Sequence, residues 1–145
     1  MKTPPNALMV QRYRAGLGLL AGRMILLLTT TGRKSSNLHT VAVQYEYLNG
    51  KYYIGAAGGQ KSDWLKNLQV NPTVTLEIGK KKLFATAEVM LEPEEITKLL
   101  EFRLKKHPLI VGLILKMDGV GFHPDHARLL EYSRRLAFAV LTPLA

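Results

Sequence analysis

One continuous stretch, residues 24–36, constrains the fold more than any other part of the sequence. It begins Met-Ile-Leu-Leu-Leu-Thr-Thr-Thr and runs without a break into Gly-Arg-Lys-Ser-Ser. An apolar, threonine-rich run of this length favours a buried β-strand, and the glycine favours a turn at its end. The strand therefore delivers two cations and two hydroxyls to one edge of a sheet, namely Arg33, Lys34, Ser35 and Ser36.

This charged turn has the chemistry of an anion site. Arginine, lysine, hydroxyls and the free amides of a turn all suit phosphate or carboxylate groups. The plain alternative is a solvated charged turn that simply follows a strand. The residues do not form a P-loop, because the first glycine and the Gly-Lys-Ser/Thr order of that motif are missing. The turn therefore suggests an anion site, and other parts of the sequence must support this interpretation.

The size and composition of the chain narrow the classes of protein. Its 145 residues predict one domain, residues 1–145, with a real core. The absence of cysteine excludes disulfides, thiolate metal sites and thiol nucleophiles. The apolar runs 17–28 and 108–115 fall short of the roughly 20 residues that span a bilayer, and with no signal peptide evident we expect a cytoplasmic protein. The formal charge of +9 favours a polyanionic partner: nucleic acid, anionic lipid or a multiply charged small ligand.

Alternation and turn signals predict an α+β fold built on an antiparallel barrel of about six strands with flanking helices. Asn49-Gly50 is the strongest hairpin signal, and Ser62 is the expected N-cap of a short helix that Asn71-Pro72 ends. The sequence predicts strands over residues 23–31, 38–48, 51–57, 73–78, 82–91 and 134–141, helices over 7–20, 64–70, 96–106 and 108–117, and a loop over 118–125.

Several residue groups invite a functional interpretation beside a plain one. Trp64, the only tryptophan, is either a core anchor or one wall of a pocket for a flat ring, and Asn67 shares its helix face. His123 and His126 are expected to be ordinary loop or surface histidines, since Pro124 disrupts a helical ligand face, so we predict no metal site. Nucleic-acid binding would need exposed aromatics among cations, but alternation turns about half of the tyrosines at 45, 47, 52 and 53 inward, and no such partner is expected.

The order of these elements resembles the deazaflavin (F420)-dependent nitroreductase family of the split β-barrel flavin-binding superfamily. The resemblance rests on Leu-Leu-Thr-Thr-Thr-Gly-Arg-Lys-Ser at residues 27–35, the Asn49-Gly50 hairpin, Ala-Ala-Gly-Gly at 56–59, and Asp-Trp-Leu-Lys-Asn-Leu-Gln-Val-Asn-Pro at 63–72. It covers residues 20–91 well and the remainder loosely. It implies coenzyme F420, a 5-deazaflavin with a phosphodiester and an oligoglutamate tail, to which the charge of +9 is suited.

The resemblance also implies where the cofactor lies. The phosphate and tail fall near Arg33, Lys34 and Ser35, followed by Ser36, where the family usually has glycine. His39 stands where the family often has arginine, which would weaken phosphate binding or make it depend on pH. The residues implied to flank the ring are His39, Thr40, Val41, Ala56, Ala57 and Gly58, and those implied to close the site are Asp63, Trp64, Lys66 and Asn67.

The function implied is hydride transfer between the deazaflavin C5 atom and a small electron acceptor, a quinone, enone or nitro compound. Tyr132 is the one candidate on the substrate side, and no catalytic residue is assigned. An FMN-dependent oxidoreductase of the same fold is the first alternative. A cofactor carrier, or a basic domain that binds nucleic acid or membrane, is the second. The N-terminal helix is expected to cover the core, with peripheral membrane contact through residues 1–20 as the alternative, and the protein is expected to be a monomer or homodimer.

Overall fold

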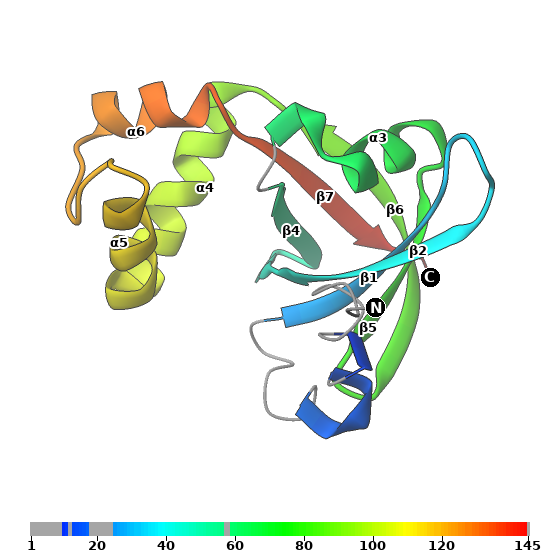
Figure 1. The fold of residues 1–145 in the computed structure, drawn as a ribbon. Coiled ribbons are helices and arrows are strands. Elements are labelled where there is room, and N and C mark those ends of the chain that lie inside the picture. Colours follow the sequence, from blue (N-terminus) through cyan, green and yellow to red (C-terminus); the bar gives the residue numbers. More distant parts are fainter. Residues whose placement is uncertain (1–9, 12, 18–24, 57–58, 145) are drawn as a thin grey trace, which may run out of the picture.

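A computed structural model describes residues 10–11, 13–17, 25–56 and 59–144. Within these ranges, one antiparallel sheet of seven strands forms the body of the molecule, and helices pack on both of its faces (Figure 1). The order across the sheet is β2-β1-β5-β6-β7-β4-β3. The strands are β1 (Ile25–Thr31), β2 (Leu38–Gln44), β3 (Glu46–Leu48), β4 (Lys51–Ala56), β5 (Thr73–Ile78), β6 (Lys81–Met90) and β7 (Ala137–Pro143).

The connection between β2 and β3 makes the sheet curl. These strands occupy opposite edges of the sheet, yet only Tyr45 separates them in the sequence. One residue of extended chain covers only about 3.3 Å, so the two edges must approach each other. The sheet therefore bends into a barrel that stays split between its edge strands, and this confirms the predicted fold class.

Two cores on opposite faces of the sheet hold the helices. Inside the curl, Leu65 and Leu68 of α3 (Asp63–Val70) pack with buried residues of the strands, among them Leu28 and Ile54. On the outer face, Phe138 of β7 packs against three helices: α4 (Pro93–Lys106), α5 (Pro108–Met117) and α6 (His126–Ser133). The short 3-10 helix η2 (Gly59–Lys61) connects β4 to α3.

The described part of the N-terminal segment is tied to the sheet through one tyrosine. The Tyr13 hydroxyl, in the π-helical turn η1 (Tyr13–Leu17), donates to the Ile25 carbonyl at 2.9 Å and accepts from the Gly79 amide at 2.9 Å. Tyr13 packs against Leu27 on the outer face of β1. The predicted helix over 7–20 falls partly outside the described residues, so only its central part can be compared.

Several sequence predictions are confirmed. The strand over 73–78 and the helix over 108–117 have the predicted bounds, and Asn49 and Gly50 have φ of 52° and 79°, as a type I′ hairpin turn requires. Ser62 occupies the N-cap position, although its side chain makes no capping hydrogen bond. None of the helices formed by the described residues is long and apolar enough to cross a bilayer.

Other predictions are wrong in their bounds. The single strand predicted over 38–48 breaks at Tyr45, which gives seven strands rather than six. Helix α4 begins at Pro93, three residues before the predicted start, because proline and two glutamates favour a first helical turn. Helix α6 was not predicted, and its presence moves the start of the last strand from residue 134 to Ala137.

Candidate functional site

The turn after β1 is compact and internally bonded. The Gly32 amide donates to the Asn37 carbonyl at 2.7 Å, and the Ser36 amide donates to the Gly32 carbonyl at 3.1 Å. Ser36 has φ of 62°, in the left-handed region where glycine is favoured, which gives a physical reason for glycine at this position in the family it resembles. The turn is thus held by its own backbone and does not need a ligand to close it.

Gly32 is required by the close packing of this turn. A Cβ atom at Gly32 would lie 2.7 Å from Ser35 Oγ and 2.9 Å from His39 Nε2. Any side chain at this position would therefore push Ser35 or the imidazole of His39 out of place. The glycine lets the end of β1 and the start of β2 bring a hydroxyl and an imidazole to the same wall.

Arg33 connects the turn to helix α3. Its Nη1 donates to Asn67 Oδ1 at 2.7 Å, and its own amide donates to the same oxygen at 3.2 Å. Its Nη2 approaches Asp63 Oδ1 at 3.4 Å, in a pair whose carboxylate is 86% exposed. Because Asn67 is buried while Asp63 is not, the bond to Asn67 is the stronger constraint. Arg33 acts as a strut between strand and helix as well as a positive charge.

Lys34 has a different position from Arg33. It is exposed, and it forms no ion pair with any carboxylate in the part of the chain that the structure describes. Its ammonium group is therefore available to an anionic ligand. The sequence suggested two equivalent cations, whereas the structure gives one strut and one available charge.

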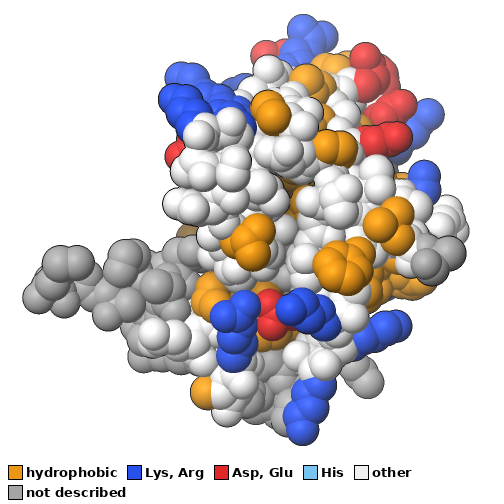
Figure 2. Space-filling model, turned by 90° about the vertical axis from the view of Figure 1, so that its right-hand side faces the viewer, with side chains coloured by type: hydrophobic (Ala, Val, Ile, Leu, Met, Phe, Trp, Pro, Cys, Tyr) orange, Lys and Arg blue, Asp and Glu red, His pale blue; other side chains and the backbone are white. Residues whose placement is uncertain are grey.

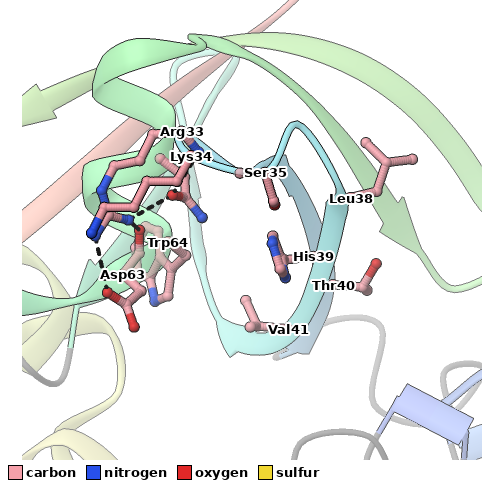
Figure 3. A pocket seen from close by; sticks show the side chains of 11 residues that line it. Arg33, Lys34, Ser35, Leu38, His39, Thr40, Val41, Asp63 and Trp64 are labelled. Carbon is pink, nitrogen blue, oxygen red and sulfur yellow. Dashed lines mark hydrogen bonds and ion pairs between the residues drawn. The ribbon is translucent and has the colours of Figure 1, made fainter.

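Figure 3 shows the cavity that these residues border, with a volume of about 610 Å³. Arg33, Asp63 and Trp64 lie on one side of it, and His39 and Val41 of β2 point toward them from the other. The lining residues are Gly32, Arg33, Lys34, Ser35, Leu38, His39, Thr40, Val41, Asp63, Trp64 and Asn67.

A second cavity, of about 570 Å³, adjoins the first through two shared residues, Val41 and Trp64. It lies between the end of β2, the ends of β4 and β7, and the helices α4, α5 and α6. Aliphatic side chains such as Val111, Ile114 and Leu115 of α5 form most of its wall. The two cavities therefore lie side by side against Val41 and Trp64, and we call them together the groove, with Arg33 and Lys34 at one end and a mainly apolar wall at the other.

Few polar side chains enter the apolar cavity. The Tyr132 hydroxyl donates to Asp118 Oδ2 at 2.5 Å. Burial, that hydrogen bond and the charge of Asp118 raise the pKa of Tyr132 well above its usual value of about 10, so the phenol keeps its proton far into the alkaline range. Arg103 of α4 also borders the cavity, and its Nε lies 3.5 Å from a carboxylate oxygen of Glu46, which is buried.

The structure gathers most of the predicted site residues. Ser36 and Lys66 line neither cavity, and Ala57 and Gly58 lie outside the described residues. Ala56 and Tyr132 border the apolar cavity together with Val41 and Trp64. The others line the first cavity: Arg33, Lys34, Ser35, His39, Thr40, Val41, Asp63, Trp64 and Asn67. Trp64 fits both interpretations made of it, because it packs against the inner core and forms the junction of the two cavities.

Sequence reasoning missed Arg103, Asp118 and the contribution of α5. One signal for Arg103 was available: it continues the buried stripe of Ile96, Leu99 and Leu100 at helical spacing, where an arginine needs a partner. His126, considered for a metal, contacts Glu101 at 3.1 Å and Glu94 at 3.7 Å. Among the described residues, no three side chains of the metal-binding types are grouped to hold an ion.

Residues 6–108 match the model of the F420H(2)-dependent quinone reductase family. The chain belongs to that family. Its membership confirms the resemblance found in the sequence and the type of cofactor expected, since the family is F420H2-dependent and its members are oxidoreductases.

Individual family relatives match over shorter stretches. The F420H(2)-dependent quinone reductase Rv1261c of Mycobacterium tuberculosis is 36% identical over 66 residues, which are 43% of this chain and 44% of the relative. The chain thus matches less than half the length of that curated relative. Among solved structures, an F420-H2 dependent reductase (FDR-A) is 26% identical, covers 81% of this chain and 94% of its own, and has a TM-score of 0.53.

A more distant structure agrees in fold alone. A pyridoxamine 5′-phosphate oxidase-like protein from Listeria innocua is 13% identical, covers 92% of this chain and 94% of its own, and has a TM-score of 0.59. The split barrel is therefore shared well beyond the F420H(2)-dependent quinone reductase family.

Proposed function

We propose that this chain binds reduced F420 along the groove and passes a hydride to a quinone-type acceptor held in the apolar cavity. The observation that carries the proposal is that the two cavities adjoin at Val41 and Trp64, which line both. A ligand with an anionic tail and a flat ring, next to an apolar acceptor, needs a cationic site for the tail, an aromatic surface for the ring and an apolar cavity for the acceptor. The groove offers these in that order.

The donor set of the first cavity fits F420. The phosphodiester and glutamate groups are anions, and this end of the groove offers Lys34, Arg33 and the imidazole of His39 against the single carboxylate of Asp63. Because Gly32 has no side chain, Ser35 and His39 can both pack close to it in the wall of this cavity. Trp64 presents an aromatic surface where a planar ring would pass from the cationic end to the apolar end.

Bound reduced F420 supplies the hydride, and the work left to the protein is binding, orientation and exclusion of water. Lys34 binds the anionic tail, while Arg33 keeps the turn against α3. The aliphatic wall of α5 excludes water from the acceptor. Arg103 places a positive charge in the cavity, where it stabilises negative charge that develops on an acceptor oxygen. Tyr132 is held by Asp118 and therefore serves to orient the acceptor and not to release its proton.

A titration tests cofactor binding. Trp64 fluorescence is followed while F420, FMN or the deazaflavin core without phosphate and tail is added to the purified protein. We expect saturable quenching by F420 with FMN at least tenfold weaker, and Lys34→Ala should weaken F420 but not the tail-less core. Lys81→Ala, a change at an exposed lysine of β6, is the matched control. Equal affinity for FMN, or no quenching by F420, would refute the proposal.

A second experiment tests the acceptor cavity. Ile114→Trp places a large side chain in the wall of the apolar cavity and should raise the KM for a quinone such as menadione at least fivefold, while leaving the Kd for F420 unchanged. The measurement is the return of oxidised F420 absorbance under anaerobic conditions. An increase in the Kd for F420 with no change in the KM for menadione would show that the ring, and not the acceptor, occupies this cavity.

A further inference from the structure

Helix α5 has two apolar faces, and only one of them is covered. Val111, Gly112 and Leu115 are buried against the outer core. The opposite side carries four large side chains that are exposed by 74%, 47%, 53% and 78%: Leu109, Ile110, Leu113 and Met117. We call these four residues the α5 face. A helix that is apolar all round and exposed on one side is typical of a surface that contacts something else.

Lysines stand near both ends of the α5 face in the sequence. Lys105 precedes the helix, Lys116 lies in its last turn, and both are exposed. From residue 102 to residue 117 the sequence contains no acidic residue. Neither lysine has a carboxylate partner within the described part of the chain.

The carboxylates near the α5 face are already engaged. Glu46 is buried and pairs with Lys106 at 3.1 Å and with His107 at 3.3 Å. Asp118 accepts the hydrogen bond of the Tyr132 phenol, a neutral partner that leaves its negative charge in place two residues after Lys116, and Glu101 contacts His126. A partner that approaches the α5 face therefore meets apolar side chains together with two exposed lysines, Lys105 and Lys116, that form no ion pair within the described residues.

We propose that the α5 face docks on the surface of an anionic lipid bilayer. Apolar side chains of an interfacial helix enter the headgroup region while flanking lysines contact anionic headgroups. A second copy of the chain is disfavoured, because a twofold contact through α5 would bring Lys105 and Lys116 of one protomer toward the same cations of the other. The sequence offered residues 1–20 as an alternative site of membrane contact, and α5 is a separate element from these.

The position of α5 suits this role. In Figure 1 the helix lies at the outer end of the helical layer, away from the sheet. Figure 2 shows the face that lies at the right of Figure 1, away from α5, where exposed hydrophobic side chains lie in small separate groups among polar surface. The side of α5 turned away from the α5 face forms a wall of the apolar cavity, so docking brings that cavity within about one helix diameter, 10 Å, of the lipid. The lipid contact itself does not depend on the proposed cofactor or reaction.

Vesicle binding by the full chain tests the inference without any turnover. The protein is sedimented with vesicles of equal parts phosphatidylcholine and phosphatidylglycerol, or of phosphatidylcholine alone. We expect binding to the anionic vesicles and at least tenfold weaker binding to the neutral ones. Salt at 0.5 M should release most of the protein, because exposed charges are screened at a Debye length of about 4–5 Å.

Two pairs of variants separate the apolar and charged contributions. Leu109→Gln with Met117→Gln should lower anionic-vesicle binding at least tenfold, whereas Val70→Gln with Leu144→Gln, at residues exposed by 60% and 52% far from α5 in the sequence, should not. The charge pair is Lys105→Gln with Lys116→Gln, and its control is Lys81→Gln with Lys82→Gln. All eight substitutions in these four double variants are at exposed positions, and thermal unfolding checks that each variant is folded.

Three results would overturn the inference. They are an absence of wild-type binding to anionic vesicles, equal binding by the α5 variants and their controls, and equal binding to neutral vesicles. Light scattering after size exclusion tests whether a second copy of the chain covers the α5 face instead. A dimer that the double variant Leu109→Gln with Met117→Gln converts to a monomer, together with no vesicle binding, would assign the α5 face to that second copy.

Discussion

The different positions of Arg33 and Lys34 lead to opposite expectations for two neighbouring substitutions. Arg33→Met should lower the stability of the protein, because it removes the strut between the β1–β2 turn and α3. Lys34→Met should leave stability unchanged and lower only the affinity for F420. The sequence alone gives no reason to distinguish these adjacent cations.

The expected loss for Arg33→Met follows from one hydrogen bond. Hydrogen bonds to charged groups contribute about 1.5–3 kcal/mol. The lower end applies here, because the Arg33 side chain is 24% exposed and the Asn67 oxygen keeps the Arg33 amide as a donor. The pair with the exposed Asp63 adds little. A loss of about 1.5 kcal/mol corresponds to a fall in Tm of roughly 4–6 °C for a domain of this size.

The expected loss for Lys34→Met concerns the ligand. A contact between an exposed ammonium and an anion is screened by water, so about 1 kcal/mol is expected, or about a fivefold increase in the Kd for F420. Urea unfolding followed by Trp64 fluorescence measures stability, and the F420 titration measures affinity. If Lys34→Met lowered the unfolding free energy while Arg33→Met did not, the roles assigned to the two cations would be wrong.

Three further substitutions test other features of the site. Because its pKa is raised, Tyr132 keeps its proton in the folded state at pH values above the unfolded pKa of about 10. The free energy of unfolding should therefore fall as pH rises beyond that value. Tyr132→Phe should make this fall shallower in alkaline unfolding curves. Glu46→Gln removes the carboxylate that Arg103, Lys106 and His107 contact and should cost about 2 kcal/mol in urea unfolding, less than a fully buried pair because two of those three partners are about half exposed. Ser36→Gly removes the strain of a non-glycine residue in the left-handed region and should raise Tm by roughly 2–3 °C without changing the Kd for F420. A lower Tm would show that Ser36 is not strained.

The strands and the cationic end of the groove could be predicted because their signals are local. The run that ends at Thr31, the Asn49-Gly50 turn and the alternation of β5 each depend on a few adjacent residues. The proposed anion site draws on the turn after β1, the start of β2 and helix α3, so its residues come from two stretches of the sequence, 32–41 and 63–67. Local chemistry pointed to the cations and hydroxyls of the turn and to Trp64 and Asn67, whereas His39, Thr40, Val41 and Asp63 were named from the family resemblance.

Features set by distant contacts could not be predicted in the same way. Tyr45 looks like the middle of one alternating strand, and the break there exists because the chain passes from one edge of the sheet to the other. Helix α6 is only eight residues long, and its N-cap signal at Asp125 follows a proline in a segment rich in loop residues. The direction of the Arg33 side chain depends on Asn67, 34 positions later in the sequence. Each of these requires the fold before it can be seen.

The apolar cavity is the feature that depends most on distant contacts. The ion pairs that Glu46 makes with α4 and with His107 show why. Hydrophobic contacts alone are non-directional and would allow α4 and α5 to pack at several distances from the sheet. Glu46 of β3 pairs with Arg103 and Lys106 of α4 and with His107 at the junction of the two helices, so it fixes where α5 begins relative to the sheet edge. The volume available beside Trp64 therefore depends on a carboxylate that does not line the cavity. We expect the choice of acceptor to respond to substitutions at Glu46 as well as to those in the cavity wall.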